Sequence, residues 1–68
     1  MIVKYFKDTD TALFEFSSRP VEETREIAEN VYVDLDENGN LVSMTIEHAA
    51  TVAALPTIQL EEIGAPAA

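Results

Sequence analysis

One stretch of the chain has oxygen-bearing side chains at a spacing typical of calcium sites. Asp34-x-Asp36-x-Asn38-Gly39 matches the first six positions of an EF-hand loop, whose alternate oxygens and glycine wrap a hard cation. The twelfth position of that loop needs a bidentate Glu but is Thr45 here, and the flanking segments alternate as strands rather than as helices. The stretch therefore predicts a polar hairpin turn, with a weak cation site as the alternative.

The remaining candidates for chemistry are a histidine and the acidic turns. His48 is the only histidine, and it could act as a general base or a metal ligand. Its place between a strand and a helix favours packing or hydrogen bonding at the helix start. Acidic residues of two turns could work as paired carboxylates if the fold gathers them at one end of the sheet. They are Asp8, Asp10, Asp34, Asp36 and Glu37. With no recognisable nucleophile or phosphate-binding glycine loop, we expect no enzyme and assign no catalytic residue, metal or cofactor.

The chain is strongly acidic. Its formal net charge is -9, from 13 Asp and Glu against 4 Lys and Arg. Phosphate backbones and anionic membrane surfaces bind clusters of basic residues, which this chain lacks, so neither nucleic acid nor a membrane is an expected partner. A basic protein or a cation suits the charge better, although excess acid also serves solubility. No apolar run approaches the roughly 20 residues of a membrane span or forms a signal peptide, and we expect a cytoplasmic protein.

Alternation of apolar and polar residues predicts two β-hairpins. The first joins strands at residues 2–6 and 11–16, and the second joins strands at 31–35 and 41–47 through an acidic turn. The Asn-Gly pair in that turn favours a tight type I′ geometry. Successive side chains point to opposite faces of a strand, so each strand has an apolar face that we expect in the core. These faces comprise Ala12, Phe14 and Phe16, then Val31, Val33 and Leu35, and finally Val42, Met44 and Ile46.

Residues 21–30 leave two interpretations open. Local propensity favours a helix, because Ser18 could cap it, Pro20 suits its first turn and glutamates follow. The alternative is an exposed edge strand whose charges discourage aggregation. As a strand, Val21, Glu23, Arg25 and Ile27 share one face, and Glu22, Thr24 and Glu26 share the other. For Arg25 we expect a bidentate pair with a carboxylate that fixes strand register or a subunit contact.

The C-terminal part of the chain changes composition. Residues 48–55 are rich in Ala and are stopped by Pro56, which predicts a short helix. Residues 1–55 are then a single small domain, and 56–68 form a tail that is partly disordered or docked on a neighbouring protomer. With 68 residues and no Cys, the chain lacks the disulfides that support many very small domains. Self-association is the support that we expect instead.

Several stretches, taken in order, point to a known family. They are Tyr5 with Asp10-Thr11-Ala12-Leu13-Phe14-Glu15-Phe16, then Glu23-Thr24-Arg25-Glu26-Ile27, then Val31-Tyr32-Val33-Asp34-Leu35-Asp36-Glu37-Asn38-Gly39-Asn40-Leu41-Val42, and Ile46-Glu47-His48-Ala49. They resemble a small bacterial domain of unknown function, the family numbered twenty-two eighty-three. The resemblance runs from about residue 1 to residue 51. It implies an antiparallel sheet with a short helix near the C-terminus, and it favours strand for residues 21–27. It supplies no catalytic residues. The genes of its members resemble small genes that are found beside genes of toxin-like partners. This resemblance implies an antitoxin or neutralising role.

These observations together predict an α+β protein, a small antiparallel β-meander of about five strands with a short C-terminal helix. The predicted function is a non-enzymatic protein-interaction module that binds a basic partner by charge and strand addition, antitoxin-like in its sharpest form. The alternative is a homo-oligomeric binder of a small molecule or divalent cation, with its site between protomers. The candidate binding residues are Glu22, Glu23, Arg25, Glu26, Asp34, Asp36 and His48.

Overall fold

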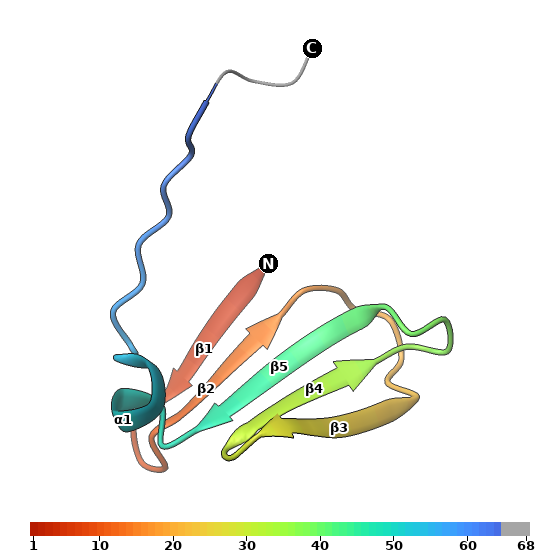
Figure 1. Ribbon diagram of the computed structural model, residues 1–68, viewed down its shortest axis with the longest axis horizontal. Helices are drawn as coiled ribbons and strands as arrows, with labels where there is room; N and C mark the ends of the chain where they lie inside the picture. Colours follow the sequence, from red (N-terminus) through yellow and green to blue (C-terminus); the bar gives the residue numbers. More distant parts are fainter. Residues whose placement is uncertain (65–68) are drawn as a thin grey trace.

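The fold is an antiparallel β-sheet with one short helix against it (Figure 1). The computed structural model describes residues 1–64. The elements are β1 (Ile2–Phe6), β2 (Thr11–Glu15), β3 (Glu23–Ala28), β4 (Val31–Leu35), β5 (Leu41–Glu47) and α1 (Ala49–Ala53). Five antiparallel strands followed by a short helix confirm the predicted α+β class.

The strands lie in the order β1-β2-β5-β4-β3. The β1–β2 hairpin therefore lies beside a three-stranded meander, and the connection from β2 to β3 passes along one end of the sheet to its far edge (Figure 1). β5 is central and pairs with both β2 and β4, whereas β1 and β3 are the two edges.

This order separates the two acidic turns. Thr11 lies opposite Glu47 and Glu15 lies opposite Ser43, so β2 begins where β5 ends. The β1–β2 turn is consequently at one end of the sheet, and the β4–β5 turn is at the other. The hypothesis that the carboxylates of both turns gather at one end is therefore wrong.

The core lies on one face of the sheet, towards the end where α1 packs against β5 (Figure 1). Val31 lies opposite Ile46 and Val33 opposite Met44, so the predicted apolar faces of β4 and β5 coincide. The buried cluster is Ala12, Ile46, Ala49 and Leu55, with Tyr5, Phe14, Val31 and Met44 packed against it. No large side chain among residues 1–64 is fully buried. The core is therefore thin, as the length of the chain predicts.

Phe16 is not part of this core. The sequence predicts it beside Phe14, but its side chain is 38% exposed. β2 ends at Glu15, and the backbone amides of Phe16 and Ser17 both donate to the carbonyl oxygen of Val42, at 2.8 and 3.1 Å. The regular alternation of faces stops there, so the aromatic ring is left outside the core.

β3 is a strand despite a local composition that favours a helix. It pairs with β4 from Glu23 opposite Leu35 to Ala28 opposite Val31, with an irregularity near Ala28. The strand implied by the family resemblance is confirmed, although it begins after Val21. Tertiary pairing thus overrides local propensity in this segment.

The β4–β5 turn differs from the predicted type I′ geometry. Gly39 has a φ of +80°, but Asn38 is not among the residues with positive φ, and type I′ needs both. The Gly39 amide donates to the carbonyl oxygen of Asp36 at 3.0 Å, and the Asp36 amide donates to the carbonyl oxygen of Asn40 at 2.9 Å. These bonds define a three-residue loop, a type I turn followed by a left-handed glycine. The glycine is required because its backbone is left-handed.

The helix is attached to the sheet by Asp10 in the β1–β2 turn. The backbone oxygen of Asp10 accepts from the Ala49 amide at 2.9 Å, and its carboxylate accepts from the Ala50 amide at 3.1 Å. The same carboxylate accepts from the Tyr5 hydroxyl at 2.5 Å. α1 is shorter than the predicted 48–55, because the residues flanking it adopt left-handed conformations.

Beyond the helix, residues 57–64 form neither helix nor strand and lead away from the sheet (Figure 1). Residues 65–68, the last part of the tail that is predicted to be partly disordered or docked, lie outside the described residues. Within the described part of the chain, no helix has the length and apolar character needed to cross a membrane.

Candidate functional site

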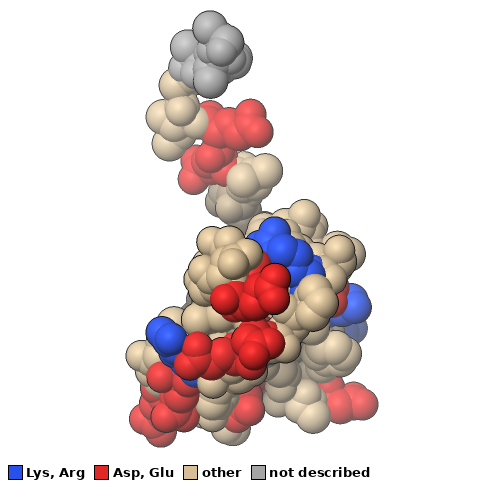
Figure 2. All heavy atoms as spheres, turned by 90° about the vertical axis from the view of Figure 1, so that its right-hand side faces the viewer, with Lys and Arg blue, Asp and Glu red and all other residues tan. Residues whose placement is uncertain are grey.

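The most distinctive surface of the molecule is one edge of the sheet. We define the acidic edge as Glu22 together with β3, Glu23–Ala28. β3 is an edge strand, and all six of its residues are exposed. An edge strand leaves backbone N–H and C=O groups unpaired along its outer side. Figure 2 shows this side of the molecule, where many acidic side chains and fewer basic ones face the viewer.

The acidic edge contains one basic residue, and that residue is neutralised locally. Arg25 Nε donates to Glu23 Oε2 at 2.8 Å, and Arg25 Nη2 donates to Glu23 Oε1 at 3.0 Å. The guanidinium holds the pKa of Glu23 below its usual value, and the carboxylate raises that of Arg25. The expected bidentate pair exists, but both partners belong to one strand. It therefore cannot fix the register between strands.

Glu26 lies on the opposite face of β3, beside Tyr32 of β4. The neighbouring Glu26 carboxylate is the largest cause of a raised pKa for the Tyr32 hydroxyl, and the charge of Glu47 adds to it. Both faces of β3 therefore carry a carboxylate. None of the ion pairs within the described residues involves Glu22 or Glu26, so their charges are not offset by a paired cation.

Asp34 links the three strands of the meander. Its Oδ1 accepts from the hydroxyl of Thr24 and its Oδ2 from the hydroxyl of Ser43, each at 2.5 Å. Thr24, Asp34 and Ser43 are direct cross-strand partners on β3, β4 and β5. Both carboxylate oxygens thus take part in a polar row that stabilises strand pairing.

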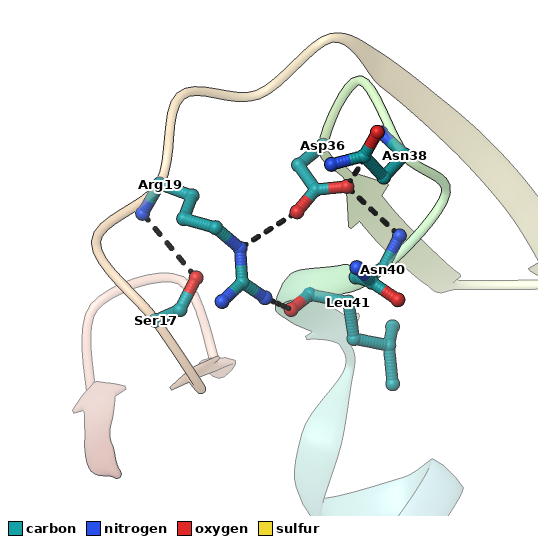
Figure 3. A network of polar contacts seen from close by, with 6 residues as sticks. All are labelled: Ser17, Arg19, Asp36, Asn38, Asn40 and Leu41. Carbon is teal, nitrogen blue, oxygen red and sulfur yellow. Dashed lines mark hydrogen bonds and ion pairs between the residues drawn. The ribbon is translucent and has the colours of Figure 1, made fainter.

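Asp36 organises the β4–β5 turn and is the most buried charged residue described, at 5% exposure. Its Oδ1 accepts from the backbone amides of Asn38 and Asn40, both at 2.9 Å (Figure 3). Its Oδ2 lies 2.6 Å from Nε of Arg19, which reaches it from the β2–β3 connection. Oδ2 has this ion pair but no well-directed hydrogen bond among the described residues.

Several groups determine the acidity of Asp36. The Asn40 amide makes the largest contribution and lowers the pKa of the carboxyl group, while burial opposes it. The Asn38 amide and the Arg19 guanidinium lower the pKa further. The net effect is a pKa below its usual value, because bonds to the charged form outweigh its loss of hydration.

A groove adjoins the start of the acidic edge. Its volume is about 320 Å³, and it is lined by Arg19, Pro20, Glu22, Asp36, Glu37 and Asn38. The Glu22 amide donates to the carbonyl oxygen of Leu35 at 2.8 Å, which holds this part of the connection against β4. Since Arg19 is paired with Asp36, exposed Glu22 and Glu37 leave the rim acidic.

The structure brings only some of the predicted site residues together. Glu22, Glu23, Arg25 and Glu26 share the acidic edge, and Asp36 lines the adjoining groove. His48 is exposed and remote, at the end of β5 that leads into α1. Its side chain makes no capping bond, although its carbonyl oxygen accepts from the amides of Thr51 and Val52. Within residues 1–64, no three acidic or histidine side chains are placed to hold a metal ion.

Arg19 is the site residue that the sequence interpretation missed. Its Nη2 donates to the carbonyl oxygen of Leu41 at 3.1 Å, in addition to the ion pair with Asp36. An Asp at the first position of a type I turn is a recognisable signal that could have indicated the role of Asp36. No comparable signal in the sequence identifies its partner Arg19, because the pairing depends on where the β2–β3 connection passes along the end of the sheet.

The fold and the site define a class of small acidic α+β proteins, in which a thin sheet leaves a charged edge strand open. The chain belongs to the family described as a protein of unknown function, DUF2283, which matches residues 2–49. That range contains all five strands and confirms the family resemblance. No curated protein and no solved structure matches the chain.

Proposed function

We propose that this is a cytoplasmic, non-enzymatic interaction module that binds an extended segment of a basic protein along the acidic edge. The observation that carries the proposal is that every residue of β3, an edge strand with two glutamates, is exposed. Unpaired backbone groups of such an edge accept an added strand, and the charge selects which strand is added. In its sharpest form the module neutralises a basic partner, as an antitoxin does.

The groove beside β3 supports the same partner chemistry. Its rim carries Glu22 and Glu37, and the arginine that lines it, Arg19, is already paired with Asp36. A lysine or arginine side chain at the end of the bound segment would therefore find carboxylates without a competing free cation. The added strand supplies affinity through backbone bonds, and the groove adds selectivity for a basic residue.

The direct test uses a fluorescent peptide that alternates lysine and valine. Anisotropy should report saturable binding that weakens as salt is raised, because exposed charges are screened. The Glu22→Lys, Glu23→Lys, Glu26→Lys variant should retain its circular dichroism spectrum and lose binding. A lysine–proline peptide of the same charge should bind much more weakly, since proline cannot supply the ladder hydrogen bonds.

A matched control separates the acidic edge from the overall charge. The Asp8→Lys, Glu15→Lys, Glu62→Lys variant changes the net charge by the same amount away from β3, and it should keep most of the binding. Equal loss in both triple variants would reduce the effect to net charge and overturn the proposal. Equal binding of the lysine–proline peptide would rule out strand addition.

A further inference from the structure

The second open edge of the sheet has a different character. We define the basic edge as β1, Ile2–Phe6, together with Lys7. It carries Lys4 and Lys7, two of the 4 basic residues of the chain. The other two, Arg19 and Arg25, are paired with Asp36 and Glu23. Arg25 also lies among the carboxylates of the acidic edge, so Lys4 and Lys7 are the basic residues that lie apart from that edge and its groove.

The basic edge is also apolar. Ile2 is 56% exposed and Phe6 is 49% exposed, and they share one face of β1 with Lys4. The Lys4 ammonium lies 3.3 Å from Glu15, but both side chains are substantially exposed. Exposed pairs of this kind contribute little and exchange readily, so Lys4 remains available to a second carboxylate.

The tail has the complementary character. Residues 58–63 are extended and lead away from the sheet (Figure 1). Leu60 is 85% exposed and Ile63 is 94% exposed, and Glu61 lies between them. Large apolar side chains at such exposure are unfavourable in water unless another surface covers them.

We propose that residues 58–63 of one copy add as a strand along the basic edge of a second copy, in a reciprocal exchange. With Glu61 beside Lys4, side-chain alternation places Leu60 beside Val3 or Tyr5, on the face that holds the core. The same register places Ile63 beside Ile2 or Phe6. This match holds for either strand direction, because the apolar positions of β1 are symmetric about Lys4.

Charge determines which edge the tail selects. The acidic edge repels both Glu61 and Glu62, whereas Lys4 of the basic edge attracts Glu61. The two edges therefore bind different segments: β1 takes the tail of another copy, and β3 stays free for the segment of a basic protein. A reciprocal exchange closes with two-fold symmetry and extends both sheets by one strand. It also supplies the burial that the thin core of one chain lacks.

The test uses the absence of cysteine from the chain. Lys4→Cys and Glu61→Cys are prepared as separate full-length variants, mixed, and oxidised. The proposal predicts a disulfide-linked dimer containing one of each, identified by mass, because cross-strand neighbours lie within disulfide reach. A mixture of Glu61→Cys with Glu26→Cys is the matched control, and it should yield far less of the mixed dimer.

Charge exchange gives a second, independent readout. Lys4→Glu should raise the dissociation constant of the dimer by about 10-fold in sedimentation equilibrium, and adding Glu61→Lys to it should restore most of that loss. Circular dichroism verifies that each variant is folded. A monomer at every concentration would overturn the proposal. So would a disulfide that forms only within the Lys4→Cys, Glu61→Cys double variant, since that result places the tail on its own β1.

Discussion

Arg19 and Asp36 join two connections that lie far apart in the sequence. Arg19 Nε lies 2.6 Å from Asp36 Oδ2, so the β2–β3 connection is held against the β4–β5 turn. Because the same guanidinium also donates to Leu41, one side chain anchors the passage by which the chain reaches the acidic edge. The position of β3 thus depends on a polar contact as well as on its pairing with β4.

Replacing Arg19 should destabilise the protein. Arg19→Met removes the ion pair and the bond to Leu41, leaving the nearly buried Asp36 carboxylate without its counterion. We expect the melting temperature to fall by several degrees. Arg25→Met is the matched control, because its pair with Glu23 is exposed and lies within one strand. It should change the melting temperature by about one degree at most. Equal effects of the two variants would contradict the anchoring role of Arg19.

The pKa of Asp36 predicts a dependence of stability on pH. Its pKa in the folded protein lies below the usual 3.8, so the folded state binds fewer protons than the unfolded state around that value. The resulting stabilisation is fully present above the ordinary pKa and is lost as pH falls through the lowered one. Urea unfolding should give a difference in the free energy of unfolding between the wild type and Asp36→Asn that is constant near neutral pH. That difference should shrink only when the pH falls below the ordinary pKa. A difference independent of pH would show that the charge of Asp36 is not the source of its effect.

The two tyrosines should both titrate above their usual pKa, for different reasons. The hydrogen bond to Asp10 is the largest cause for Tyr5, and the neighbouring carboxylate of Glu26 is the largest cause for Tyr32. Since the chain has only these 2 tyrosines, Tyr5→Phe and Tyr32→Phe each isolate one of them for ultraviolet titration.

The controls for this titration are the two carboxylates. Asp10→Asn should lower the pKa of Tyr5 and leave that of Tyr32 unchanged, and Glu26→Gln should do the reverse. For each tyrosine, stabilisation is complete below the ordinary pKa of 10.0 and is lost as pH rises through the raised one. A phenol that titrates at its ordinary value would show that the carboxylate beside it does not interact with the hydroxyl.

Much of the fold was predictable because it rests on local alternation. Both hairpins follow from runs of apolar residues at every second position, and β1 has the predicted bounds. β3 was ambiguous because its glutamates favour a helix locally, and only the family resemblance favoured the strand. The exposure of Phe16 could not be predicted, since it depends on where β2 ends rather than on the pattern.

The candidate site was less predictable because it depends on strand order. The acidic residues of β3 were identified from the sequence, but their place on an open edge follows from the position of β5 between β2 and β4. The possible cation loop was ambiguous for a related reason. Its two aspartates serve different partners, since Asp34 binds hydroxyls of neighbouring strands and Asp36 binds turn amides and Arg19. Sequence spacing alone does not distinguish these roles.

Gly39 should be the more sensitive of the two glycines to substitution. Its φ is +80°, and a Cβ added there would meet nothing within 4 Å, so only the backbone conformation opposes a side chain. Gly39→Ala should therefore cost about 1–2 kcal/mol in urea unfolding, with an unchanged dependence on denaturant. Gly39→Asn should cost less, because Asn adopts the left-handed conformation more readily.

Gly64→Ala is the matched control: its φ of +99° is also positive, but it lies in the exposed tail, outside the sheet. It should leave the unfolding of the isolated chain unchanged. If Gly39→Ala were equally neutral, the turn could not require a left-handed residue, and the assignment of a type I turn followed by a left-handed glycine would be wrong.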